Sequence, residues 1–146
     1  MELKNPFGVN EYLNEKNAAR IYSKCNQLLA KDGLSTQGIL NHYKVELVGT
    51  TDDPCDDLAA HHQIAKAKGK TKVVPSFRPD KALNIQDVTA FKSYMQLLEK
   101  RTGIKIVSIS TLLAALSNRV DYFHKHGGRV SDHGFTQMPN QFQLST

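Results

Sequence analysis

The sequence predicts a parallel α/β fold, and three observations support this class. Helical and strand patterns follow one another along the chain in the order α, β, α, β, α, α, β. Strands that are separated by helical crossovers pair in parallel, with right-handed connections. Each predicted strand also ends in a polar or charged cluster, and such clusters meet at the C-terminal edge of a parallel sheet. Together, the three clusters predict a functional site at that edge.

The first 43 residues are predicted to be mainly helical. Apolar residues recur at helical spacing after Asn14, and Asp32-Gly33 ends this helix. A short turn or helix is expected over 35–42. The segment 44–51 (KVELVGTT) alternates with period 2 and predicts the first strand.

Two βα units and a final strand follow. A helix is expected from Asp56 to about Lys68, with Gly69 at its end, and residues 71–78 predict the second strand, which Pro79 keeps from continuing into a helix. Two further helices and the short segment 129–134 come next. The expected helix starts are Asn84 and Ser110, and the expected ends are Thr102-Gly103 and His126-Gly127-Gly128. The expected core residues are Leu58, Ile64, Ala65, Val88, Phe91, Tyr94 or Met95, Leu98, Leu112, Leu113, Leu116, Val120 and Phe123.

Length and composition are those of one globular domain. The chain has 146 residues, 40% hydrophobic and 23% charged, enough for a buried core. We expect a single domain over 1–146, made of an N-terminal helical region (1–43), βα units (44–135) and a tail (136–146). Without a signal-peptide pattern, an apolar run near 20 residues or a disulfide framework, the sequence favours a cytoplasmic protein and excludes a membrane span.

The net charge of +5 raises the question of nucleic-acid binding. The densest basic run, 66–72 (KAKGKTK), lacks interleaved aromatic residues. It therefore favours a solvated helix end over a phosphate-binding patch, and no nucleic-acid partner is expected.

The acidic stretch 50–57 (TTDDPCDD) has several interpretations. Asp56 and Asp57 suit the start of a helix, where acids complement the helix dipole. Thr51 and Asp52 lie closer to the strand end and are candidates for the site. A metal site is a less favoured alternative, because the pattern contains no HxH or HExxH motif. Its ligands would be Asp52, Asp53, Asp56, Asp57, His61 and His62.

The other two strand ends carry Arg78 and the pair Asp132-His133. Arg78 suits either a surface loop with an internal ion pair or a two-point grip on a carboxylate or phosphate. Adjacent residues of a strand point to opposite faces, so Asp132 and His133 do not form a simple dyad. Asp132 could transfer a proton or hydrogen-bond a sugar hydroxyl.

Four motifs give the chain a resemblance to the uronate isomerase (glucuronate isomerase) family of the amidohydrolase superfamily. They are ELKNPFGV, VGTTDDPCDDLAAHH, VVPSFRPDKALNI and YFHKHGGRVSDHGF, in this order over residues 2–135. The resemblance implies a (β/α)8 barrel, of which this chain would form parallel βαβ units with N-terminal helices.

The resemblance also implies a reaction in carbohydrate metabolism, specifically glucuronate catabolism. The family interconverts D-glucuronate and D-fructuronate, and D-galacturonate and D-tagaturonate, and binds a divalent metal, usually zinc. Carried over to this sequence, Asp132 is the expected catalytic residue and Arg78 the expected contact for the uronate substrate. Thr51, Asp52 and His133 are further expected substrate-binding residues.

The sequence departs from the family in lacking the HxH metal motif that the first barrel strand carries. A barrel needs about 250 residues and eight strands, so we expect an internal fragment that is inactive by itself and binds no metal. Its unpaired sheet edges would favour self-association into a homo-oligomer. The alternative is a non-catalytic α/β binding or interaction module.

Overall fold

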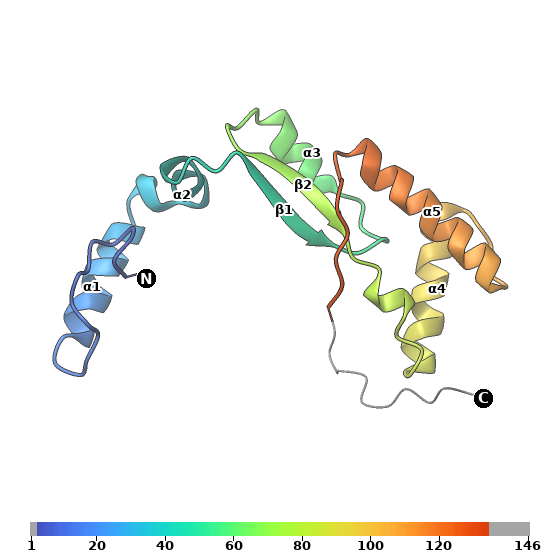
Figure 1. Cartoon of the computed structure of the whole chain (residues 1–146), viewed down its shortest axis with the longest axis horizontal. Coiled ribbons are helices and arrows are strands. Elements are labelled where there is room, and N and C mark those ends of the chain that lie inside the picture. The colour runs from blue at the N-terminus through green and yellow to red at the C-terminus, as the bar shows by residue number, and fades with distance from the viewer. Residues whose placement is uncertain (1–2, 135–146) are drawn as a thin grey trace, which may run out of the picture. The chain divides into compact units, whose positions relative to one another are not determined.

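The computed structural model describes residues 3–134 (Figure 1). The chain divides into two compact units, Met1–Glu46 and Leu47–Thr146. The border lies close to the expected change from the helical region to the βα units. The expectation of one domain stays a prediction, and the expected tail 136–146 lies outside the described residues.

The first unit contains α1 (Ala18–Leu29), η1 (Asp32–Leu34) and α2 (Thr36–His42). α1 begins four residues after Asn14, because the Asn14 side chain accepts hydrogen bonds from the Lys16 and Asn17 N–H groups and forms a turn there. Ile21 is the buried residue of α1. α2 is capped by the Ser35 hydroxyl, which accepts from the Gly38 N–H at 3.1 Å.

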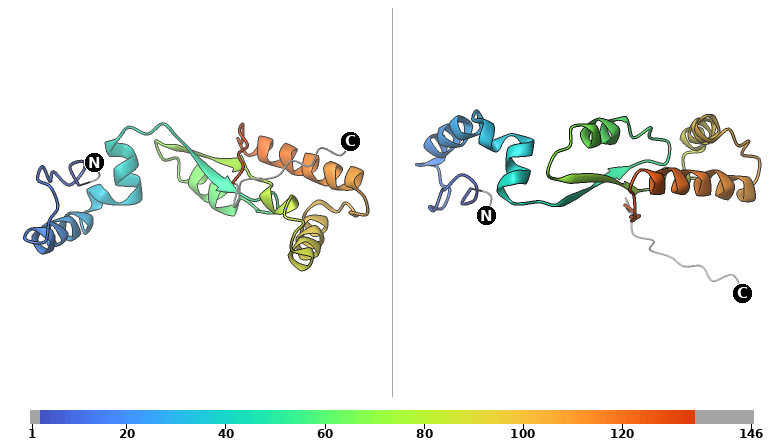
Figure 2. Two further views of the ribbon diagram at one scale, coloured as in Figure 1. Left: turned by 60° about the horizontal axis from the view of Figure 1, so that its bottom comes forward. Right: turned by 90° about the horizontal axis from the view of Figure 1, so that it is seen from above.

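The second unit contains a parallel pair of strands, β1 (Leu47–Asp52) and β2 (Lys72–Phe77), in register from Leu47 with Lys72 to Asp52 with Phe77. Both figures show β1 beside β2, with the crossover helix α3 on one side of the pair (Figures 1 and 2). α3 spans Ala59–Lys66 and begins later than expected because Leu58 has a left-handed backbone (φ 56°).

The predicted third strand is reduced to one parallel bridge between Phe77 and Ser131. The Phe77 N–H donates to Val130 O at 3.1 Å, and the Asp132 N–H donates to Phe77 O at 3.2 Å. The expected strand over 129–134 is therefore wrong in extent but right in place and direction.

Two helices follow the sheet: α4 (Val88–Thr102), after the short turn η2 (Asp80–Ala82), and α5 (Ile109–Lys125). Their caps differ from the expected Asn84 and Ser110. Asp87 accepts from the Ala90 N–H at 2.9 Å, and Ser108 forms a capping box with Thr111. Within residues 3–134, no helix combines the length and apolarity that crossing a membrane requires.

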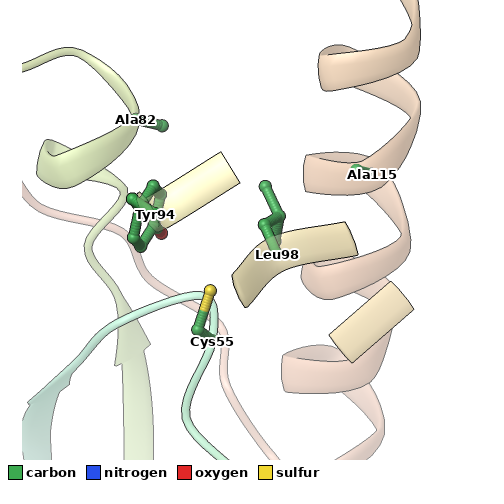
Figure 3. Packing of buried hydrophobic residues seen from close by; sticks show 5 residues of the cluster. All are labelled: Cys55, Ala82, Tyr94, Leu98 and Ala115. Atoms are coloured by element: carbon green, nitrogen blue, oxygen red, sulfur yellow. The ribbon is translucent and has the colours of Figure 1, made fainter. Parts of the chain in front are cut away.

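The main core joins α4, α5, η2 and the loop after β1. Figure 3 shows its five buried residues, which are Cys55, Ala82, Tyr94, Leu98 and Ala115. A second cluster, Leu58, Phe77 and Phe123, holds α5 against β2, and the rings of Phe77 and Phe123 meet edge to face at 5.2 Å. Leu113 and Val120, expected in the core, are 59% and 47% exposed, because α5 buries the face that carries Ala115, Arg119 and Phe123 instead. Ile64, Ala65 and Val88, also expected in the core, are exposed as well.

Candidate functional site

Three backbone segments meet at the C-terminal edge of the sheet, as the strand order predicts. The Arg78 N–H donates to Asp52 O at 3.0 Å, which joins the ends of β1 and β2. On the other side of β2, the bridge at Phe77 brings Ser131 and Asp132 alongside. The three predicted polar clusters therefore lie next to one another.

Arg78 is the centre of a polar network at this edge. Its Nη2 donates to Asp132 Oδ2, and its Nε lies 4.0 Å from Asp80 Oδ2. Asp80 in turn accepts from the Gly134 N–H at 2.7 Å, and His133 Nδ1 lies 2.9 Å from Asp80 Oδ1. Arg78 thus grips a carboxylate and also has an acid of its own loop nearby. Asp132 contacts Arg78 and His133 contacts Asp80, so the two adjacent residues have different partners within one network.

The charges of the network stabilise one another. The hydrogen bond from the Gly134 N–H, followed by that from His133, lowers the pKa of Asp80 below its usual value. Asp132 raises the pKa of Arg78, so the guanidinium stays charged. Arg78 Nε and Asp132 Oδ1 are enclosed yet have no hydrogen-bond partner within residues 3–134. Enclosed polar groups without partners are costly, so these two atoms are the unused hydrogen-bonding capacity of the network.

Thr51 and Asp52 lie on opposite faces of β1. Asp52 is in register with Phe77, so its side chain points to the face that α3 and α5 cover. There its carboxylate accepts from the Thr50 hydroxyl at 2.6 Å, and His61 of α3 lies 2.7 Å from the same hydroxyl. Asp52 therefore points to the face opposite that of Thr51, and its expected role in substrate binding stays a prediction. Thr51 is exposed on the other face, which by alternation also carries the side chain of Arg78.

The remaining acids of the stretch have structural partners. Asp53 accepts from the Tyr94 hydroxyl at 3.1 Å and pairs with Lys81 at 3.4 Å. Asp56 accepts from the Asp53 N–H, and Asp57 accepts from the Ala59 N–H at the start of α3. Among the residues that the structure describes, no three His, Cys, Asp or Glu side chains are placed to hold a metal ion. The residues of this segment therefore do not fit a resident metal.

One residue that positions the edge was missed from the sequence. Arg119 of α5 is only 5% exposed, and its guanidinium donates to Pro54 O at 2.6 Å and Asp56 O at 2.8 Å. The same guanidinium lies 3.9 Å from the centre of the Tyr122 ring. It holds the loop that follows β1. Its spacing of four residues from both Ala115 and Phe123 was a signal that it shares the buried face.

Comparisons with known proteins place this arrangement in a family. The glucuronate isomerase family model matches residues 1–144. Curated relatives named uronate isomerase include that of Solibacter usitatus, 42% identical over 149 residues, and that of Phocaeicola vulgatus, 40% identical over 137 residues. These matches cover 99% and 94% of this chain but 32% and 29% of the relatives, so the chain spans about a third of their length.

Solved structures show the same likeness. The uronate isomerase of Thermotoga maritima superposes with a TM-score of 0.81 at 28% identity, over 90% of this chain and 29% of that one. The glucuronate isomerase of Caulobacter crescentus superposes with a TM-score of 0.80 at 24% identity, over 90% of this chain and 27% of that one, which shows the fold alone.

These findings confirm the resemblance and the predicted fold class, which is parallel βαβ units of a (β/α)8 barrel with N-terminal helices. The family match covers nearly the whole sequence and includes all four motifs on which the resemblance rests. The chain belongs to the glucuronate isomerase family.

Proposed function

We propose that this chain is a segment of a uronate isomerase that interconverts aldose and ketose sugar acids. The substrates would be D-glucuronate and D-galacturonate, and the products D-fructuronate and D-tagaturonate. The observation that supports this most directly is Arg78, which lies at the C-terminal edge of the sheet and already grips a carboxylate, that of Asp132. The carboxylate of a uronate offers two oxygens to the planar guanidinium, whereas Asp132 contacts Arg78 through Oδ2 alone.

The roles of the residues follow from their positions. Arg78 would bind the carboxylate of the open-chain sugar acid and fix its orientation. Asp132, released from Arg78 in part and with Oδ1 unpartnered, would accept the proton from C2. An enediol then forms, the proton returns to C1, and the carbonyl moves from C1 to C2. Asp80 and His133 would hold Arg78 and the strand-end segment in place.

A divalent metal, as the family implies, would need donors beyond residues 3–134. When bound it would stabilise negative charge on the substrate oxygens. Every step above uses side chains of this segment only. A cytoplasmic location and homo-oligomerisation stay predictions.

A chimera tests the proposal. The segment replaces its matching 149 residues in the Solibacter usitatus relative, and uronate isomerisation is measured. Arg78→Met should raise KM for D-glucuronate about 30- to 100-fold, the value of a charge-assisted pair, and Arg78→Lys should recover part of the loss. Arg129→Met, an exposed change on the segment after α5, should leave KM within about twofold. An Arg78→Met chimera with unchanged KM would remove Arg78 from the site.

Isotope exchange tests the role of Asp132. Reaction in D2O should place deuterium at C1 of the ketose product, since the abstracted proton exchanges with solvent at a carboxylate. Asp132→Asn should lower kcat far more than KM. A product without deuterium, together with an unchanged kcat for Asp132→Asn, would remove Asp132 from proton transfer.

A further inference from the structure

A basic cavity lies at the N-terminal end of β2, away from the candidate site. Its volume is about 570 Å³, within the usual range for small-molecule sites. β2 has six residues, so the cavity and Arg78 are separated by roughly 15–20 Å along the strand. All of its lining residues belong to the second unit.

Four lysines and three histidines from separate elements line the cavity. They are Lys68, Lys70, Lys72, Lys125, His61, His62 and His126. None of the described residues that line it is acidic, and none of the four lysines forms an ion pair with a carboxylate within residues 3–134. The sequence alone favoured a solvated helix end for this basic run. The structure adds Lys125 and His126 from α5, more than 50 residues away in the chain.

The negative ends of the neighbouring helices neutralise only part of the positive charge of the four lysines. α3 and α5 both end near the cavity, and each C-terminus contributes about half a negative charge. Two such ends offset about one of the four lysine charges, which leaves roughly three in excess. The N–H groups of Gly69 and Lys70 also have no acceptor within the described residues.

The walls of the cavity are fixed by packing. A Cβ on Gly127 would lie 3.3 Å from a methyl carbon of Val74, so the loop after α5 packs closely on β2. The ring of His126 lies 4.6 Å from that of His62 and 4.1 Å from that of Tyr122, which ties α5 to α3. The four lysines are exposed around these packed walls, so their side chains can move to contact a ligand.

We propose that this cavity binds a small phosphorylated molecule carrying at least two negative charges. Lysine ammonium groups bind phosphate oxygens as point charges, and free backbone N–H groups add directional hydrogen bonds. The site does not depend on the isomerase reaction, and its ligand differs from a uronate in bearing phosphate.

The test is a pyrophosphate titration of the 146-residue chain at constant ionic strength, followed by amide NMR. We expect saturable shifts at Gly69, Lys70 and Gly127 with a Kd of about 1 mM or tighter. Lys70→Gln/Lys125→Gln should weaken binding by about tenfold per lysine. The matched pair Lys92→Gln/Lys100→Gln removes the same charge from exposed positions of α4 and should bind like the parent. Lys70→Arg/Lys125→Arg keeps the charge and should retain binding.

Three results would overturn the proposal. They are the absence of saturable shifts, equal weakening by the two glutamine pairs, and shifts centred on Arg78 instead of the cavity. A fourth is binding of a single-stranded RNA through the same amides while pyrophosphate does not bind, which would assign the surface to nucleic acid. The amide spectrum of each variant also reports whether it is folded.

Discussion

The buried guanidinium of Arg119 should contribute substantially to the stability of the second unit. Arg119→Met keeps the apolar stem and removes both hydrogen bonds to the loop after β1. Pro54 O and Asp56 O would then lose their donor, and Pro54 lies among the most completely buried residues.

The size of the effect follows from opposing contributions. Two hydrogen bonds from a charged group are worth roughly 3 to 6 kcal/mol, and the contact with the Tyr122 ring adds about 1 kcal/mol. A buried cation without a carboxylate partner is also costly, so removing it returns several kcal/mol. The cost of the two carbonyls left without a donor exceeds this gain, so we expect the free energy of unfolding to fall by about 3 kcal/mol.

Urea unfolding followed by circular dichroism measures this loss. With a typical slope for a small protein, the midpoint should fall by roughly 1 to 3 M, and hydrogen exchange at Ala115 should speed up in parallel. Arg129→Met is the matched control. Arg129 also donates to two backbone carbonyls, His124 O and Gly128 O, but is exposed, and its loss should cost less than about 1 kcal/mol. Equal effects of the two substitutions would refute the argument from burial.

Three further predictions concern the hydrogen bond of Asp80 and the burial of Tyr94 and of Leu98. The Gly134 N–H lowers the pKa of Asp80, so their contact is complete at neutral pH and is lost only as the pH falls below the ordinary aspartate pKa of about 3.9. The Gly134 amide shift should titrate there, and a shift that stays constant would contradict the contact. Burial raises the pKa of Tyr94, so the unfolded chain ionises first, and stability should fall by about 1.4 kcal/mol per unit above pH 10. Tyr94→Phe should abolish this slope, and an unchanged slope would assign it to other groups. Leu98→Ala should cost about 2 to 5 kcal/mol, whereas Leu97→Ala, at a site 43% exposed, should cost less than about 1 kcal/mol; similar costs would contradict the burial of Leu98.

Most elements of the fold were predictable because their signals are local. The strand patterns over 44–51 and 71–78 and the apolar spacing of the helices identified both strands and every long helix in order. Helix starts were less predictable, since several residues compete as caps. Asn84 and Asp87 are both good caps, and only the backbone path decides that Asp87 accepts from Ala90.

The sequence predicted which strand ends form the candidate site, but it did not predict all of the contacts among their side chains. Parallel order alone brings Arg78 and Asp132 to one edge, and the structure joins them. The face of Asp52 was not predictable, because it depends on which side of the pair α3 and α5 cover. Asp80 was missed as a partner of His133 and Gly134, which lie more than 50 residues away and leave no periodic signal.

The Arg119 contact also determines when the loop after β1 can form during synthesis of the chain. Pro54 and Arg119 are 65 residues apart, so a ribosome adding 5 to 20 residues per second makes the arginine roughly 3 to 13 s after the proline. During that interval the Pro54 and Asp56 carbonyls remain without their final donor. The loop that follows β1 therefore cannot reach its final form during synthesis until α5 has emerged.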